Sequence, residues 1–442
     1  MLRFSSNALI ILASFGLFAC DSIKNPFASK EAPKLEGERK SILKDTNKLS
    51  VSDSLADLSI SLPPAATIND WQQEGGNAQH NIAPIAANLN FTLTNSIKIG
   101  EGNGWSSALA PAPVVSQQAV FAMDAKGYIS AHDRKDINQI LWKSEAAANP
   151  ESKLAGGGLA LHDDKLYVAT GAGDVLALES KNGKVIWKKS LRIPARSAPT
   201  ISDTGVYVIT ANSEIFALDI ATGELRWQHK GIQETANLLG AVPPALSENL
   251  VIANYPSGEI YALDQSDGSV RWQDSLLLPE HTQALGVFSG SGGAPILANG
   301  GVFSVSGNGL LAANVLETGL RIWERPLSSN CTPWLGGEFL YVISTTGELV
   351  ATHARDGRIK WTSDISELIG KSPEIIAHTK GPYIIGGQLL VIPSKGEWLA
   401  FSPTDGKLTA RYKVQDGIAA HAAFADNSLF AVMQNGTLIE VK

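Results

Sequence analysis

Cysteine is scarce in this chain of 442 residues. Its two cysteines, Cys20 and Cys331, are far apart, which excludes a framework of disulfide bonds. The eight histidines are scattered, so the sequence shows no zinc-ligand spacing. Basic residues are not in excess either, and the formal net charge of −7 argues against nucleic acid as the main partner. Neither a G-x-S-x-G nor an H-E-x-x-H motif is present, which removes two common hydrolase signatures.

The apolar run that begins at Ala8 is too short to span a bilayer comfortably as a permanent helix. Its position after Arg3 and before the small residue Ala19 is typical of a secretory signal. The segment LFAC, which ends at Cys20, resembles a bacterial lipobox. This resemblance implies that residues 1–19 are a signal peptide and that the Cys20 sulfur carries a lipid. The alternative is an ordinary signal peptide with a chance cysteine.

Residues 20–69 are rich in Ser, Lys, Asp and Pro. The stretch EAPKLEGERKSILKDTNK has no apolar period of a helix or a strand. We therefore expect residues 20–69 to form a flexible, lipid-attached tether and residues 70–442 to form the folded domain.

The folded domain consists of repeats. Eight segments carry an apolar strand, a polar Gly-rich turn and a second apolar strand, from VFAMDAKGYISAHD at Val120 to LFAVMQNGTLIEVK at Leu429. A further apolar stretch precedes each hairpin, and in seven copies another follows, often ending in tryptophan. These tryptophans recur every 38 to 51 residues: Trp142, Trp187, Trp227, Trp272, Trp323 and Trp361. A four-stranded unit of this length predicts an all-β, eight-bladed β-propeller of antiparallel blades.

The eighth hairpin reaches Lys442 without a fourth strand. The segment LNFTLTNSIKIG, Leu89 to Gly100, is a spare strand candidate before the first blade. We expect this N-terminal strand to complete the last blade and close the ring.

The repeated joint is represented by ALDIATGELRW, Ala217 to Trp227. Asp219 is expected to bond backbone N–H groups of the turn, and Gly223 to supply a positive φ. Trp227 is expected to fill the interface between blades. Two copies depart from the pattern: AHDRKDINQILW has an extra residue and no Gly, and AFSPTDGKLTA has Ala410 in place of Trp.

The A-L-D-x-x-T-G-x-x-x-W repeat resembles that of the quinoprotein propellers, whose dehydrogenases bind pyrroloquinoline quinone. WQQEGGNAQHN, Trp71 to Asn81, also resembles the segment that opens those propellers. Together with the lipobox and the length, the repeats resemble the BamB family of outer-membrane assembly lipoproteins. This resemblance implies a non-catalytic scaffold without cofactor or metal that binds a POTRA domain of BamA. Unfolded outer-membrane proteins are a further candidate partner. The resemblance also implies a lipid anchor in the outer membrane, facing the periplasm, although Asp21 resembles an inner-membrane retention signal of enteric bacteria.

A quinone-dependent dehydrogenase is the alternative from the same superfamily. Those enzymes cover the cofactor with an adjacent pair of cysteines, whereas Cys331 has no cysteine neighbour. Asp203, Asp264 and Asp356 lie near turns, where carboxylates more often bond the backbone than bind a metal. A lipid-anchored propeller that binds some other ligand or the cell wall is a third possibility.

The family resemblance also implies a partner-binding region, in the loop before a S-A-P-T sequence and in the corresponding loop of the next blade. Ser197 to Thr200 matches this anchor. The candidate partner-binding residues are Leu191, Arg192, Ile193, Arg196, Asn237, Leu238 and Leu239. The family favours acidic residues in the second loop, where this chain has Glu234. The competing interpretation is that Leu191 and Leu238 cap the propeller.

Replacement of the proposed lipid acceptor tests the anchor. We expect Cys20→Ser to move the protein from the membrane pellet to the soluble periplasmic fraction, because serine cannot receive the thioether-linked lipid. Fractionation followed by immunoblotting measures this. A variant that stays with the membrane in high salt would contradict the lipid anchor.

Overall fold

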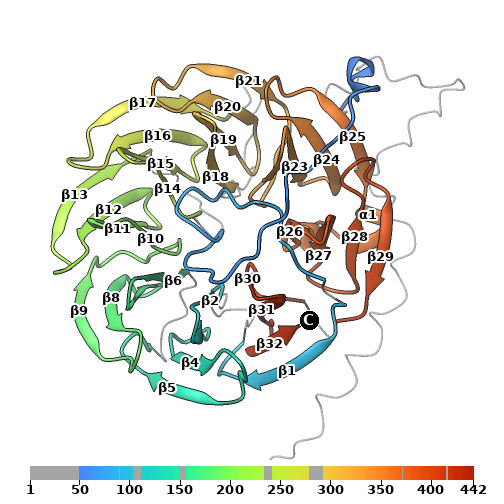
Figure 1. Cartoon of the computed structure of the whole chain (residues 1–442). Helices are drawn as coiled ribbons and strands as arrows, with labels where there is room; N and C mark the ends of the chain where they lie inside the picture. The colour runs from blue at the N-terminus through green and yellow to red at the C-terminus, as the bar shows by residue number, and fades with distance from the viewer. Residues whose placement is uncertain are drawn as a thin grey trace, which may run out of the picture. The chain divides into compact units, whose positions relative to one another are not determined.

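The computed structural model describes residues 49–88, 90–102, 111–149, 156–232, 241–277, 292–370, 372–414 and 417–442. Within these ranges the strands form eight four-stranded antiparallel sheets, arranged as blades around a central axis (Figure 1). The predicted all-β, eight-bladed propeller is therefore confirmed, and the eight predicted hairpins form the second and third strands of the blades.

The strands of the first four blades follow one another in the chain. Blade 1 contains β2 (Val114–Val115), β3 (Ala119–Met123), β4 (Ile129–Asp133) and β5 (Ile140–Ser144). Blade 2 contains β6 (Gly157–His162), β7 (Lys165–Thr170), β8 (Asp174–Glu179) and β9 (Val185–Ser190). Blade 3 contains β10 (Thr200–Ile201), β11 (Gly205–Ile209), β12 (Glu214–Asp219) and β13 (Leu225–Lys230). Blade 4 contains β14 (Ala245–Leu246), β15 (Leu250–Asn254), β16 (Glu259–Asp264) and β17 (Val270–Ser275).

Blades 5 to 7 have the same organisation, and blade 8 combines strands from both ends of the folded region. Blade 5 contains β18 (Gly293–Ala298), β19 (Gly301–Val305), β20 (Leu311–Val315) and β21 (Arg321–Arg325). Blade 6 contains β22 (Trp334–Gly336), β23 (Phe339–Ile343), β24 (Glu348–His353) and β25 (Ile359–Asp364). Blade 7 contains β26 (Lys380–Ile385), β27 (Gln388–Ile392), β28 (Trp398–Phe401) and β29 (Leu408–Tyr412). Blade 8 contains β30 (Ala423–Ala425), β31 (Ser428–Val432), β32 (Thr437–Val441) and β1 (Leu93–Lys98).

Helical structure is short among the described residues. It comprises the 3₁₀ turn η1 (Asp53–Leu55) and the helices α1 (Ser366–Ile369) and α2 (Pro373–Ala377). None of the helices in the described ranges has the length and apolar character needed to cross a membrane.

Each blade is buried on both faces except at its outer strand. In blade 3, every residue of β11 (GVYVI) is buried, because neighbouring blades cover both faces of the sheet. The outer strand β13 (LRWQHK) alternates, and Trp227 is its one buried residue. The core of the protein therefore lies between the blades and is repeated around the ring.

A tryptophan on the outer strand seals each of blades 1 to 6 against the next blade. The Trp227 indole N–H donates to the Gln265 carbonyl of blade 4 at 2.9 Å. A Cβ added to Gly268 in the same turn would lie 2.6 Å from the Trp227 ring, and Gly268 also has a φ of 74°. Only glycine fits both constraints. The same arrangement joins Trp142 to Gly183, Trp187 to Gly223, Trp272 to Gly319, Trp323 to Gly357 and Trp361 to Gly406.

The turn between β12 and β13 and the start of strand β13 fix the position of Trp227. Asp219 accepts hydrogen bonds from the backbone N–H groups of Ala221 and Thr222, at 3.0 and 2.9 Å, as predicted. Trp227 pairs with Ala217 while Leu225 pairs with Leu218, so the strand contains a β-bulge just before the tryptophan. The predicted interface role of Trp227 is confirmed.

The predicted ring closure is also confirmed. β1 pairs with β32 in antiparallel register, and Thr92 and Lys442 exchange backbone hydrogen bonds of 2.8 and 3.0 Å. The outer strand of blade 8, β1, comes from before blade 1, so no turn links it to β32. Blade 8 therefore has no turn glycine for a tryptophan of blade 7 to cover, and blade 7 has Ala410 at the position of that tryptophan. Phe91, just before β1, packs instead against Tyr412 and Trp398 of blade 7, with ring centroids 4.4 and 5.9 Å apart.

The extended turn of blade 1 holds a buried arginine at the ring closure. Arg134 donates to the carbonyl oxygens of Asn69 and Ser116, at 2.6 and 3.0 Å. Its guanidinium also forms an ion pair with Asp426 of blade 8 at 2.6 Å. The extra residue of this copy thus accommodates a side chain that joins blade 1 to blade 8.

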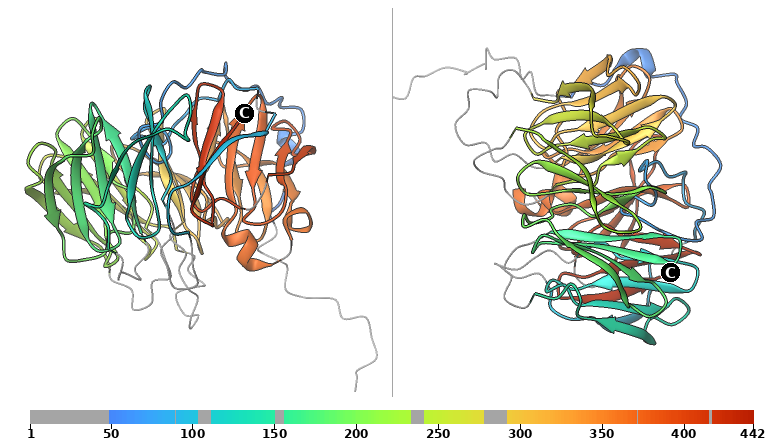
Figure 2. Two further views of the ribbon diagram at one scale, coloured as in Figure 1. Left: turned by 90° about the horizontal axis from the view of Figure 1, so that it is seen from below. Right: turned by 90° about the vertical axis from the view of Figure 1, so that its left-hand side faces the viewer.

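Residues 49–88, called the strap below, lie across one face of the ring (Figures 1 and 2). The strap begins at the rim of blade 6, where Val51 forms a parallel bridge with Ile359. From Ile68 to Ile85 its backbone and side chains bond seven other blades near the axis. These bonds involve Val115, Leu161, Ile201, Leu246, Leu297, Ile384 and Asp426. Residues 49–69, which the sequence assigns to the tether, therefore contact the ring, and WQQEGGNAQHN is the part of the strap that crosses the axis.

Loss of one interface tryptophan is expected to destabilise the ring. We expect Trp187→Ala to lower the free energy of unfolding by about 3–5 kcal/mol, since it opens a cavity and removes the indole N–H that donates to the Ile220 carbonyl at 3.1 Å. Urea denaturation followed by circular dichroism measures this.

The neighbouring residue is the matched control. Ile186 lies on the same strand with 42% of its surface exposed, so Ile186→Ala is expected to change the free energy of unfolding by no more than about 0.5 kcal/mol. Equal effects of the two substitutions would contradict the role given to the tryptophan.

Candidate functional site

The ring has two different faces. The strap covers the face that carries the turns between the third and fourth strands of the blades. The opposite face, called the loop face below, carries the connections from each outer strand to the next inner strand and the turns between second and third strands. In the left view of Figure 2 the blue strap runs along the upper edge, and the orange helices α1 and α2 lie at the lower edge.

The predicted partner-binding loop joins β9 to β10 on the loop face. Leu191 is buried, with 9% of its surface exposed, and its N–H donates to the Gly173 carbonyl at 2.7 Å. It packs in one cluster with Trp187, which fits the interpretation of Leu191 as a cap. Ile193 is half-buried against the same cluster.

Arg192 is the exposed residue of this loop. Its φ of 61° is left-handed, so the backbone turns between the two apolar neighbours. Arg196 is half-buried, and burial lowers the pKa of its guanidinium. The S-A-P-T sequence that follows, Ser197 to Thr200, is buried, and the Thr200 hydroxyl donates to the Pro244 carbonyl before blade 4 at 2.7 Å. Among the described candidates, the structure therefore places Leu191 in the core and Arg192 on the surface, while Ile193 and Arg196 are half-buried.

The other predicted residues lie outside the described ranges. Asn237, Leu238 and Leu239 belong to residues 233–240, as does Glu234, and Cys20 belongs to residues 1–48.

A groove of about 480 Å³ lies on the loop face beside blades 3 and 4. Ile232, which is 63% exposed, and Leu277 contribute apolar surface from two successive loops. Tyr261 and the carboxylates of Glu259 and Asp274 complete the lining. The sequence analysis missed this groove, because its residues come from strands and turns that are adjacent only in the ring.

The two carboxylates of the groove differ in their partners. Asp274 faces the Arg321 guanidinium, with Oδ1 2.6 Å from Nη2. Glu259 accepts hydrogen bonds from the Ile232 N–H at 2.8 Å, the Tyr261 hydroxyl at 3.0 Å and the Ser257 hydroxyl at 3.1 Å. Both carboxylates belong to blade 4.

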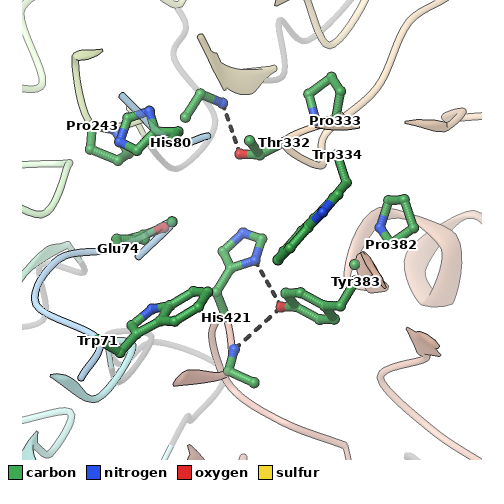
Figure 3. Close-up of a pocket in the computed structure, with 14 residues that line it drawn as sticks. Trp71, Glu74, His80, Pro243, Thr332, Pro333, Trp334, Pro382, Tyr383 and His421 are labelled. Atoms are coloured by element: carbon green, nitrogen blue, oxygen red, sulfur yellow. Dashed lines mark hydrogen bonds between the residues drawn. The ribbon is translucent and has the colours of Figure 1, made fainter. Parts of the chain in front are cut away.

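A second, smaller cavity of about 40 Å³ lies at the axis beneath the strap (Figure 3). Trp71, Glu74 and His80 line it from the strap. The inner strands and loops of blades 4 to 8 contribute the remaining wall, which includes Pro243, Thr332, Pro333, Trp334, Pro382, Tyr383 and His421.

Burial keeps the histidines of this cavity neutral. It lowers the pKa of His80 to about 4 and that of His421 to about 3. The Ala422 N–H donates to the Tyr383 hydroxyl at 3.2 Å, and this hydroxyl lies 3.1 Å from Nδ1 of His421. Because the ring of His421 is neutral, the hydroxyl can donate to Nδ1. Burial also raises the pKa of Glu74, against the opposing charge of Lys380.

The axial residues do not fit a quinone cofactor. A pocket for a ligand of that size needs roughly 300–1,000 Å³, whereas the strap leaves about 40 Å³. Among the described residues, no three His, Cys, Asp or Glu side chains gather to hold a metal ion. Cys331 is buried, its thiol donates to the Thr379 carbonyl at 3.2 Å, and burial raises its pKa to about 11.

Two of the three turn aspartates, Asp264 and Asp356, bond the backbone as the sequence suggested, whereas Oδ1 of Asp203 lies 3.3 Å from Nε2 of His162. Asp264 accepts from the Ser266 N–H at 2.8 Å, and Asp356 from the Arg358 N–H at 3.0 Å. These hydrogen bonds and the nearby arginines lower the pKa of both carboxyls.

The chain is similar to known assembly factors. The family model described as outer membrane protein assembly factor BamB matches residues 125–363. BamB of Salmonella typhimurium is 26% identical over 357 residues, which are 79% of this chain and 89% of that protein. BamB of Escherichia coli is 25% identical over 353 residues, which are 79% of this chain and 87% of that protein.

Solved structures share the fold. BamB from Moraxella catarrhalis aligns with a TM-score of 0.66 at 21% identity and covers 79% of this chain and 98% of its own. A quinohemoprotein alcohol dehydrogenase from Comamonas testosteroni aligns with a TM-score of 0.63 at 14% identity and covers 85% of this chain and 81% of its own. At these identities both likenesses concern the fold alone.

The buried His80 predicts a specific dependence of stability on pH. Its pKa rises from about 4 in the folded chain to 6.5 in the unfolded chain. The unfolded chain therefore binds the extra proton between these values, and stability falls as pH falls through this window. We expect this group alone to lower the free energy of unfolding by about 2 kcal/mol between pH 7 and pH 5.

The variant His80→Asn isolates this contribution, because its amide N–H can still donate to the Pro295 carbonyl that Nδ1 contacts at 2.9 Å. Urea denaturation at both pH values should show a smaller loss of stability for the variant than for the parent protein. An equal loss in both would mean that His80 is not held neutral.

Proposed function

The chain belongs to the family of outer membrane protein assembly factor BamB, and on that premise we propose that it is a non-catalytic scaffold of the β-barrel assembly machinery. In this role it binds a POTRA domain of BamA and aids the folding and insertion of outer-membrane β-barrel proteins. A rigid ring suits such a role, since it holds binding loops in fixed positions.

The main support for this proposal comes from the residues exposed on the loop face. Arg192 is exposed on a left-handed turn whose neighbour Leu191 is anchored in the core, so the cation is presented on a fixed backbone. The groove lined by Ile232, Tyr261 and Leu277 lies on the same face, in the blades that follow. Apolar and aromatic surface beside an arginine is typical of an interface with energetically dominant contacts.

The axial cavity supports a role without catalysis. In this ring Trp71, Glu74 and His80 of the strap occupy the axis, where the related dehydrogenases place their cofactor. The Tyr383 hydroxyl and Nδ1 of His421 bond each other there, whereas Nε2 of His80 and Nε1 of Trp334 have no hydrogen-bond partner among the described residues. The loop face, which carries Arg192 and the groove, is therefore the surface we assign to the partner.

The anchor and the location complete the proposal. A lipid on Cys20 would attach the protein to the outer membrane on its periplasmic side, and residues 21–48 would connect the anchor to the strap. Asp21 makes the inner membrane the alternative location.

Charge reversal at Arg192 tests the partner-binding loop. We expect Arg192→Glu to reduce co-purification with BamA from detergent-solubilised membranes at least tenfold, because a buried interface cation becomes an unpaired anion. Arg192 is a better target than Leu191, whose replacement would also disturb the core. Quantitative immunoblotting of the purified complex measures the effect.

Lys181→Glu is the matched control. Lys181 is an exposed cation in the β8–β9 turn of the same blade, on the opposite face. The Lys181→Glu variant should leave co-purification with BamA unchanged. If Arg192→Glu retains BamA as well as the control does, the proposed interface is wrong.

A further inference from the structure

The outer strands of blades 1 and 2, β5 and β9, lie next to each other on the rim of the ring (Figure 1). Lys188 of β9 donates from Nζ to the carbonyl of Ala146, which follows β5, at 3.3 Å. Each of the two strands carries two successive aliphatic residues that are 40–44% exposed: Ile140 and Leu141 in β5, and Val185 and Ile186 in β9.

This pair of exposed aliphatic residues is absent from the outer strands of blades 3 and 4. There the residue before the tryptophan is an arginine, and each arginine bonds a group of its own blade, Arg226 the Thr204 carbonyl and Arg271 the Asp264 carboxylate. Exposed aliphatic residues that gather at one place, rather than being scattered singly, indicate a surface that meets something apolar.

Lysines surround the aliphatic residues of blade 2. From the end of its third strand to the end of its outer strand, residues 179–190, this blade has four lysines and one carboxylate, which is a formal charge of +3. The corresponding part of blades 1 and 3 to 7 has a formal charge between −2 and +1, in a chain whose net charge is −7. The lysines are Lys181, Lys184, Lys188 and Lys189.

Most of this positive charge is not neutralised within the blade. Lys188 pairs with Asp174 at 2.9 Å. Lys181, Lys184 and Lys189 form no ion pair with any residue that the structure describes, and the first two are exposed. Blade 2 therefore presents free ammonium groups on both sides of its exposed aliphatic pair.

Blade 5 provides the comparison. Leu320 and Ile322 are 69% and 53% exposed, so this blade also carries apolar surface on its rim. However, Arg321 between them pairs with Asp274 at 2.6 Å and also with Glu324. Of these two blades, blade 2 alone combines exposed aliphatic residues with unpaired cations.

This combination fits a membrane surface that contains anionic phospholipids. Ammonium groups are attracted to the phosphates, and each lysine close to such a surface strengthens binding roughly fivefold. Aliphatic side chains enter the boundary between headgroups and acyl chains, and the apolar stems of lysines lie beside them. An acidic protein would also attract the lysines, but the lipid anchor proposed on Cys20 keeps a membrane close to this chain.

We propose that the rim patch, which comprises Ile140, Leu141 and residues 181–189, binds anionic phospholipid headgroups at the surface of the membrane. This contact is additional to the lipid anchor and fixes which edge of the ring faces the bilayer. Because the rim lies between the two faces of the ring, the loop face with Arg192 stays accessible to a protein partner. The identification of the membrane as the outer membrane rests on the function proposed above, whereas the binding of anionic lipid does not.

Vesicle sedimentation tests the proposal. The protein used is residues 21–442, which contain the strap and all eight blades, so binding cannot come from the apolar segment after Arg3 or from a lipid on Cys20. Vesicles of phosphatidylcholine with one third phosphatidylglycerol should bind it at least tenfold more strongly than vesicles of phosphatidylcholine alone. Salt at about 0.5 M should weaken this binding, because it screens exposed charges.

Charge reversal locates the contact. The double variant Lys181→Glu and Lys184→Glu should weaken binding to the anionic vesicles at least tenfold, because it removes two attractive charges and adds two repulsive ones. The matched control is the double variant Lys395→Glu and Lys413→Glu, which makes the same change in net charge at two exposed lysines of blade 7 and just after it. The control should bind the vesicles as the parent protein does.

The apolar part of the rim patch has its own test. The double variant Val185→Ser and Ile186→Ser should weaken binding at least threefold, because serine does not partition into the acyl-chain boundary. Leu320→Ser with Ile322→Ser in blade 5 is the control and should leave binding unchanged. All four positions are exposed, and unchanged urea denaturation midpoints would verify that the ring is intact.

The proposal is overturned if the two kinds of vesicle bind alike, or if either rim variant binds as its matched control does. Binding of polyglutamate, measured by fluorescence anisotropy, without binding of anionic vesicles would also overturn it and would assign the rim patch to an acidic protein.

The lysine variant, made in the full-length chain, should still co-purify with BamA. Failure of the parent chain to bind BamA, with vesicle binding intact, would refute the scaffold function and leave the membrane contact standing. The reverse result would refute only the membrane contact.

Discussion

The packing of a tryptophan over a glycine in the next blade is the interaction on which this ring depends. Trp227 supplies an indole N–H to the Gln265 carbonyl and covers Gly268, where a side chain would collide with the ring. The contact occurs six times, so each of blades 2 to 7 is aligned by its predecessor. Because a single blade cannot bury both of its faces, these seals turn eight separate sheets into one core.

The strap adds a second level of organisation. It bonds the inner part of the ring near the axis and crosses the rim at blade 6, where it covers Ile359. Its residues leave an axial cavity of only about 40 Å³. The loop face, which carries Arg192 and the groove of blades 3 and 4, is not crossed by the strap. One segment thus joins the blades at the axis and leaves the opposite face open.

The sequence predicts the repetitive part of this structure well, because the repeat is local. The turn at Asp219, the interface position of Trp227 and the closing strand β1 follow from short motifs and from the count of strands. The strap contacts do not follow from the sequence, since most of them are backbone hydrogen bonds to residues far along the chain. In the candidate loop, motif reasoning groups Leu191 with Arg192. The left-handed backbone at Arg192 leaves Leu191 in the core and Arg192 on the surface. The local sequence has no glycine or asparagine that would have predicted this turn.

Closure of the ring by β1 and β32 has a consequence for the order of folding. Blade 8 contains residues 93–98 paired with residues 437–441, so its sheet joins segments separated by most of the folded chain. Arg134 and Asp426 span the same junction. Contacts between such distant segments slow folding, because the intervening chain must first be brought together. A growing chain cannot complete blade 8 until residues 437–441 are available to pair with residues 93–98, so closure of the ring depends on the last strand to be synthesised.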